Sequence, residues 1–284
     1  MIGRAPPGTE VVRPVRGGVV ADFEATEQLL RALLKQAGVG FLRRPRMVVC
    51  VPSGTSEAER RAVQESARAA GAGRVSLVTS PIAAALGAGL PVMEAVASMI
   101  VDVGGGCTHV AVTSLGGMVV QNSVAVAGDA LDAAIAGWLR RAHSLVIGER
   151  TAENLKVRVG SLTPDVHSDL RMRIRGRDTE TGRPGEVELT SADLAMALVE
   201  PIGEIREAVM AVLRNAPPEV SADIMDRGLL LCGGSSHLRG LDSELREATG
   251  LPVLQAEHPD ECVARGAGML LEDALLLDRV ADVH

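Results

Sequence analysis

The chain has 284 residues, which is enough for one large or two modest domains. Its net charge of -7 argues against a nucleic-acid partner, and no apolar run reaches the length of a membrane span. Aromatic residues make up 1% of the chain, so the core must be aliphatic. The four cysteines are scattered without CxxC spacing, which favours reduced thiols, and residues 1–10 lack a secretory pattern, so a cytoplasmic protein is expected.

Helix and strand patterns alternate over the first ninety residues, which predicts a layered α/β arrangement. Ser56 and Glu59 have the spacing of a capping box, and Ser80 followed by Pro81 is typical of a helix start, with the serine as N-cap. The expected elements are a helix over Thr26–Ala37, a strand over Met47–Val51, a helix from Ser56 to Gly71, a strand over Val75–Val78 and a short helix from Ser80.

Residues 99–115 predict a strand, a glycine turn and a second strand. Met99–Val103 is a short apolar run, Gly104–Gly106 interrupt it, and His109–Leu115 alternates apolar and polar residues as a half-buried strand does. Consecutive backbone N–H groups in such a turn form an anion-binding concavity. Asp102, just before the turn, is placed to hold a metal ion through water.

A similar unit occurs near the other end of the chain. The apolar strand Gly228–Cys232 is followed by Gly233, Gly234, Ser235, Ser236 and His237. Either unit alone is equally well read as a tight turn between core strands, since short glycine motifs are weak signals. Together they favour two half-sites that grip one nucleotide.

The remaining pattern continues the α/β reading, and Pro217-Pro218 marks a boundary. The expected elements are strands over Met118–Val126, Leu170–Arg175, Glu186–Leu189 and Pro252–Gln255, and helices over Asp129–Ala142, Glu149–Val159, Ser191–Asn215, 240–249 and 260–280.

Long ordered segments resemble the MreB/Mbl family of bacterial actins. They include VDVGGGCTHVAVTSLGG, GERTAENLK, RIRGRDTETGRP and RGLLLCGGSSHLRGLDSELREATGLPV. The resemblance implies the α/β actin-like fold, with two domains around a nucleotide cleft and a first domain truncated at its N-terminus. It assigns residues 1–95 and 258–284 to the first domain, 96–149 and 225–257 to the core of the second, and 150–224 to a smaller subdomain.

The resemblance also implies a function. Family members are cytoskeletal proteins that bind ATP and Mg²⁺ and form filaments on the inner face of the cytoplasmic membrane. There they govern cell shape and guide the cell-wall synthesis and elongation machinery. Sugar kinases and chaperone ATPases share this fold, but no segment suggests a sugar pocket, and no substrate domain follows the last matched segment. The stronger alternative is a degenerate, co-assembling scaffold without ATP binding or hydrolysis.

The resemblance assigns site residues in three segments. Residues 102–108 resemble the family's second phosphate loop. Residues 153–156 resemble the segment beside the adenosine, and residues 233–236 resemble the loop under the adenosine and the α-phosphate. Glu153 and Lys156, one helical turn apart, could instead be a solvated surface pair. The assigned residues are Asp102, Gly104, Gly105, Gly106, Cys107 and Thr108, then Glu153, Asn154, Leu155 and Lys156, then Gly233, Gly234, Ser235 and Ser236.

The chain also departs from the family pattern. The opening strand and first phosphate loop of the family have no counterpart after Met1, so we expect either a start codon assigned too late or a shortened paralogue. Ser80 stands where the family has the glutamate that positions the attacking water, which predicts impaired hydrolysis. His109 stands where the family usually has glutamate, and it either orients water or has no role.

Two surfaces are expected to make contacts. The helix over Ser56–Ala70 corresponds to the family helix that pairs two filaments, although Ala62, Val63 and Ala67 could equally face the core. Phe41 and Leu42 correspond to an apolar pair that inserts into the bilayer, with basic residues nearby; the alternative is that they fold back onto the core.

Overall fold

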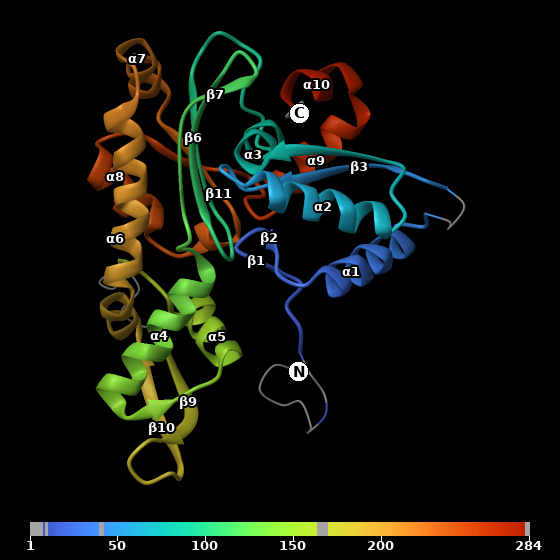
Figure 1. The fold of residues 1–284 in the computed structure, drawn as a ribbon. Helices are drawn as coiled ribbons and strands as arrows, with labels where there is room; N and C mark the ends of the chain where they lie inside the picture. Colours follow the sequence, from blue (N-terminus) through green and yellow to red (C-terminus); the bar gives the residue numbers. More distant parts are fainter. Residues whose placement is uncertain (1–7, 9–10, 40–42, 164–169, 282–284) are drawn as a thin grey trace.

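The computed structural model describes residue 8 and residues 11–39, 43–163 and 170–281 (Figure 1). At its centre lies a five-stranded sheet in the order β12-β11-β5-β6-β7. β11 runs parallel to β5 and β12, whereas β5, β6 and β7 are antiparallel neighbours. The strands are β5 (Ser98–Val103), β6 (Thr108–Ser114), β7 (Gly117–Val124), β11 (Leu229–Cys232) and β12 (Val253–Gln255).

The register of β5 and β11 brings the two glycine turns together. The strands are parallel neighbours, and Cys232 at the end of β11 lies opposite Asp102 near the end of β5. Each strand is followed directly by its glycine turn, and the second turn leads into the 3₁₀ helix η1 (Gly234–His237). Because the carboxyl ends of adjacent parallel strands meet at one edge of the sheet, this edge is where ligands bind in open α/β sheets.

A second layer, built from the N-terminal elements and the last two helices, packs beside the central sheet (Figure 1). Helices α3 and α9 cross closely in it. The crossing depends on Gly87, since a Cβ there would lie 1.9 Å from the Cys262 carbonyl oxygen. The layer contains the hairpin β1 (Val15–Arg16) and β2 (Val19–Val20), the parallel pair β3 (Arg46–Val51) and β4 (Arg74–Thr79), and helices α1 (Phe23–Gln36), α2 (Glu57–Ala69), α3 (Ser80–Gly87), α9 (Cys262–Glu272) and α10 (Ala274–Val280).

The remaining elements lie below and to the left of the central sheet in Figure 1, with α4, α5, β9 and β10 at the bottom and α6, α7 and α8 along the left side. A three-stranded antiparallel sheet, β10-β9-β8, packs with α4, α5 and α6, and α6 also packs on β6 and β7 of the central sheet. These elements are β8 (Leu145–Val146), β9 (Arg171–Asp178), β10 (Pro184–Thr190), α4 (Gly128–His143), α5 (Glu149–Val159), α6 (Ser191–Asn215), α7 (Pro218–Arg227) and α8 (Leu241–Thr249).

Most of the predicted elements are confirmed, but several details differ. A helix that was not predicted, α7, follows the expected boundary at Pro217-Pro218. The single helix expected over 260–280 is two helices that meet at Asp273. Strand β6 is almost fully buried rather than half-buried. The N-cap of α3 is Thr79, while Ser80 is the first helical residue and its hydroxyl donates to the Val51 carbonyl at 3.1 Å.

The described residues contain no helix that is both long and apolar enough to cross a bilayer. Phe41 and Leu42 lie outside the described residues, so their contact stays a prediction. The division into three sequence-assigned parts also stays a prediction.

Candidate functional site

A cavity of about 310 Å³ lies where the two glycine turns meet α4 and α5. The glycine turns supply backbone on two sides, and the helices supply charged side chains. The lining residues are Gly104, Gly105, Gly128, Asp129, Asp132, Glu153, Lys156, Val157, Gly234, Ser235, His237 and Leu238.

Backbone and hydroxyl hydrogen bonds fix the turn after β5. The carbonyl oxygen of Gly104 accepts from the Ser235 hydroxyl at 2.7 Å and from the Gly128 N–H at 3.2 Å. The Gly105 carbonyl accepts from the Asp129 N–H at 2.7 Å. The first turn of α4 and the second glycine turn therefore both hold the first glycine turn in place.

Glycine allows a close approach at two positions of this junction. A Cβ on Gly128 would lie 2.8 Å from the Ser235 hydroxyl oxygen and 3.2 Å from the Lys156 ammonium nitrogen. Gly233 has a φ of +85°, and a Cβ there would lie 2.5 Å from an Asp102 carboxylate oxygen. Both positions place backbone where any side chain would separate the walls of the cavity.

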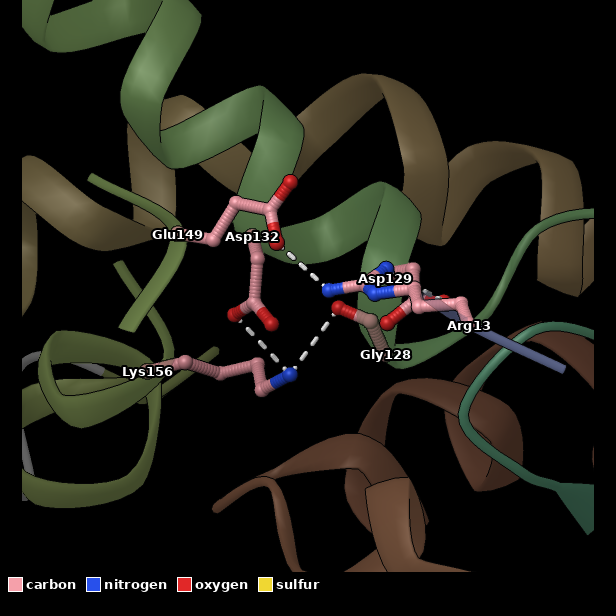
Figure 2. A network of polar contacts seen from close by, with 6 residues as sticks. All are labelled: Arg13, Gly128, Asp129, Asp132, Glu149 and Lys156. Atoms are coloured by element: carbon pink, nitrogen blue, oxygen red, sulfur yellow. Dashed lines mark hydrogen bonds and ion pairs between the residues drawn. The ribbon is translucent and has the colours of Figure 1, made fainter. Parts of the chain in front are cut away.

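Lys156 is the fixed cation of the cavity wall. Its ammonium lies 2.9 Å from the Asp132 carboxylate and donates to the Gly128 carbonyl oxygen at 2.9 Å (Figure 2). Both side chains of the ion pair are largely buried, with 13% and 15% exposure. Burial raises the pKa of Asp132, and Lys156 opposes that rise. Lys156 is thus part of the cavity wall and pairs with Asp132, not with Glu153 as a solvated surface pair would.

Asp102 lies beneath the glycine turns and does not line the cavity. It is 6% exposed, and burial raises the pKa of its carboxyl to about 6, against the lowering effect of a hydrogen bond from the Cys232 thiol. Within the described residues, no cluster of three or more His, Cys, Asp or Glu side chains could hold a metal ion alone. A single carboxylate suits Mg²⁺, which usually keeps several waters and binds with substrate phosphates.

The β1–β2 hairpin covers the first glycine turn. The Cys107 thiol donates to the Gly17 carbonyl at 3.1 Å, and a Cβ on Gly106 would lie 3.0 Å from the Gly17 Cα. Burial raises the pKa of the Cys107 thiol, and the Asp102 charge adds to this. Cys107 therefore stays a neutral donor that ties the hairpin to the turn.

Comparisons with known proteins identify the family. The sequence profile described as "MreB/Mbl protein" matches residues 1–279. The chain belongs to the MreB/Mbl family. It is 47% identical over 275 residues to the cell shape-determining protein MreB of Escherichia coli (strain K12), covering 96% of this chain and 79% of that protein. It is 40% identical over 274 residues to the cell shape-determining protein Mbl of Bacillus subtilis (strain 168), covering 96% and 82%.

The fold comparison agrees with the family. The crystal structure of MreB5 of Spiroplasma citri bound to ADP superposes with a TM-score of 0.92 at 32% identity, covering 98% of this chain and 83% of that one. MreB5 bound to AMPPNP gives a TM-score of 0.90 at 33% identity, covering 95% and 81%. The chain therefore has the actin-like fold, as its sequence predicts, and is an actin-like member of a cell shape-determining cytoskeletal family.

Six of the fourteen residues assigned from the MreB/Mbl resemblance line the cavity: Gly104, Gly105, Glu153, Lys156, Gly234 and Ser235. Several others support its walls. The Thr108 hydroxyl donates to the Val126 carbonyl at 2.6 Å, the Ser236 hydroxyl donates to the Gly233 carbonyl at 2.7 Å, and Leu155 is buried in the main core. Asn154 is exposed and does not line the cavity.

Sequence reasoning missed part of the lining. Gly128, Asp129 and Asp132 form a Gly-Asp-x-x-Asp segment in the first turns of α4, a signal that was available in the sequence. His237 and Leu238 continue the second glycine unit.

His109 lies outside the cavity lining. It is 6% exposed, its Nδ1 is 2.8 Å from the Ser123 hydroxyl, and burial lowers the pKa of its ring. A neutral imidazole fixed by a neighbouring strand fits a structural residue of β6 at least as well as a group that orients water.

Proposed function

We propose that this chain binds ATP with Mg²⁺ in the cavity between the two glycine turns, and that it assembles into filaments on the cytoplasmic membrane. The observation that carries the nucleotide proposal is the convergence of both glycine turns and the Lys156 ammonium on one cavity. MreB5 of Spiroplasma citri, at 32% identity, has been crystallised with ADP, which supports the same ligand class here.

The residues of the site have separate roles in this proposal. The backbone N–H of Gly105 cradles phosphate, and Gly104, whose N–H donates to the Cys107 carbonyl at 3.1 Å, fixes the shape of the turn. Gly234 and Ser235 lie under the nucleoside. Glu153 and the Asp132–Lys156 pair flank the ribose and base. A Mg²⁺ ion would be held through water by Asp102 together with the phosphates, and it would neutralise phosphate charge. Ser80 has no carboxylate to position water, so hydrolysis is slow.

Calorimetry with the full chain tests the nucleotide proposal. Mg-ATP is expected to bind, because both glycine turns and the Lys156 ammonium converge on one cavity. Mg-GTP is expected to bind less tightly than Mg-ATP. Equal affinity for Mg-GTP and Mg-ATP would contradict an adenosine-specific site. Absence of binding by ATP and ADP, with filaments still formed, would instead favour the co-assembling scaffold.

Membrane attachment is proposed through Phe41 and Leu42, by resemblance to the family. Burial of these two side chains contributes about 1.5–3 kcal/mol each, which attaches one subunit only marginally once the entropic cost of binding is subtracted. A filament binds more tightly because many linked subunits contact the membrane at once. Co-sedimentation of assembled protein with anionic vesicles should fall sharply for Phe41→Ser/Leu42→Ser. The exposed pair Val11→Ser/Val12→Ser is the control. Equal sedimentation of the Phe41/Leu42 variant and wild type would refute this contact.

Nucleotide binding, filament assembly and membrane attachment together would serve the determination of cell shape, for which the relatives are named. Filaments of this chain would guide cell-wall synthesis and elongation proteins along the inner face of the membrane.

A further inference from the structure

Arg13 connects the N-terminal segment to both helices that border the cavity (Figure 2). One guanidinium nitrogen lies 2.5 Å from the Glu149 carboxylate, and another lies 3.9 Å from the Asp129 carboxylate. Glu149 is the first residue of α5, and Asp129 is in the first turn of α4. A single side chain therefore bridges two helices from a segment that precedes them by more than a hundred residues.

This contact adjoins the cavity without lining it. A smaller cavity of about 150 Å³ is bordered by Arg13 and Glu149 and by Asp129 and Asp132. The two aspartates also line the larger cavity. From this neighbouring space Arg13 therefore pairs with one carboxylate of the larger cavity, that of Asp129.

The segment that carries Arg13 is held at two further points. The Pro14 carbonyl accepts from the Thr26 hydroxyl at 3.0 Å and from the Ala21 N–H at 2.9 Å, which closes the hairpin onto α1. At the hairpin turn, the Cys107 thiol donates to the Gly17 carbonyl. Arg13 adds a third tie, from the base of the hairpin to α4 and α5, so the hairpin is fixed over the first glycine turn.

We propose that Arg13 is a positioning residue that clasps this hairpin onto α4 and α5 and slows nucleotide release. The effect on release rests on the proposed nucleotide function, whereas the clasp itself does not. Arginine suits the role because its planar fork presents several donors, so that it can reach carboxylates on two helices at once. The three side chains are 41%, 65% and 62% exposed, so their ion pairs are screened by solvent and salt.

Release of a fluorescent ADP analogue from the full chain, chased with unlabelled ADP, tests the proposal. Arg13→Gln is expected to release nucleotide about twofold to fivefold faster at low salt, which is the size expected of exposed ion pairs. This difference should vanish near 0.5 M salt, because salt already weakens the wild-type clasp. Arg140→Gln, at an exposed arginine in the last turn of α4, is the matched control and should behave as wild type.

Charge exchange separates the ion pair from general damage. Arg13→Glu/Glu149→Arg should release nucleotide more slowly than either single variant. Equal release by Arg13→Gln and wild type at low salt would overturn the proposal, as would a faster release that does not depend on salt.

Amide exchange tests the clasp where release cannot be measured. In the nucleotide-free chain, Arg13→Gln should exchange faster than wild type over residues 15–21, and Arg140→Gln should not. Unchanged exchange there would contradict the clasp. If wild type binds no nucleotide but the exchange result is obtained, the nucleotide function fails and the clasp stands.

Discussion

At the scale of single residues, Asp102 has the most unusual surroundings. The carboxyl is buried where β5 and β11 end, and its charge contributes to the raised pKa of the thiols of Cys50, Cys107 and Cys232, whereas the pKa of Cys262 is lowered by its hydrogen bond with Cys232. Burial, with a contribution from the Asp102 charge, raises the pKa of Cys50 to about 12, so this thiol stays protonated. A buried carboxylate among neutral thiols is costly to ionise, and a cation held nearby through water would relieve that cost. The thiols that Asp102 affects are Cys50, Cys107, Cys232 and Cys262.

This environment predicts a pH dependence of stability. The folded pKa of Asp102, about 6, lies above its ordinary value of 3.8, so the folded chain binds this proton more tightly than the unfolded chain. The stabilisation is therefore fully present below about pH 4 and is lost as the pH rises through 6. Relative to Asp102→Asn, wild type should lose roughly 2 to 2.5 kcal/mol of unfolding free energy between pH 4 and pH 7.

Urea unfolding in nucleotide-free buffer with a chelator measures this difference. Asp226→Asn, which changes an exposed carboxylate of α7, is the control and should track wild type. Parallel stability curves for wild type and Asp102→Asn would show that Asp102 is not strained by burial.

At the scale of elements, local signals placed most boundaries. The capping box of Ser56 and Glu59 begins α2, with the Ser56 N–H donating to the Glu59 carboxylate at 2.8 Å, and α6 spans Ser191–Asn215 as its pattern predicts. Strands β1 and β2 have two residues each, too few for a periodic pattern to show. The burial of β6 depends on helices that reach it from elsewhere in the chain, since α3 and α6 both pack on it.

The features of the site also divide into those that local sequence predicts and those that depend on packing. Glycine motifs and the Glu153–Lys156 spacing are local, and sequence reasoning found them. The partners of Lys156 are not local, because Asp132 comes from α4, and Arg13 reaches the site from the N-terminal segment. Such contacts arise only when helices pack, so one sequence without its fold gives no signal for them.

Helix α2 corrects an expectation about self-association. Val63 and Ala67 are buried, and Val63 packs in a cluster with Val51 and Leu77, so they face the core. Ala58, Arg61, Glu65 and Arg68 form the exposed stripe of α2. A filament-pairing contact on this helix must therefore use that stripe, and the Val63 side chain reports on folding.

Two substitutions on α2 separate these roles. Val63→Glu buries an unpaired charge and should lower the unfolding free energy by several kcal/mol, to the point of insolubility. Arg61→Glu should leave the thermal midpoint nearly unchanged but abolish paired filaments in electron micrographs. Paired filaments from a folded Arg61→Glu variant would place the interface off this stripe. Arg140→Glu, on α4, is the control for a charge reversal elsewhere.

At the scale of the whole molecule, the cavity forms where segments distant in sequence meet. The turn after β5, the turn after β11 and helices α4 and α5 supply its walls, and the β1–β2 hairpin covers the first turn. Parallel pairing of β5 and β11 holds the two turns together. The fold thus positions backbone donors for a phosphate chain and side chains for a nucleoside, which is the central claim for this member of the MreB/Mbl family.

Two alanine substitutions in one helix test that claim most directly. Gly128→Ala places a Cβ 2.8 Å from the Ser235 hydroxyl oxygen, in the wall of the cavity. Gly137→Ala, nine residues further along α4, meets only the flexible end of Arg141 at 3.4 Å. Both should fold, since alanine favours a helix over glycine by about 1 kcal/mol.

Calorimetry of Mg-ATP binding to both variants tests whether the nucleotide binds between the two glycine turns. Gly128→Ala is expected to bind Mg-ATP at least tenfold more weakly than wild type, and Gly137→Ala is expected to equal wild type. Equal affinity of folded Gly128→Ala and wild type would contradict nucleotide binding between these two glycine turns.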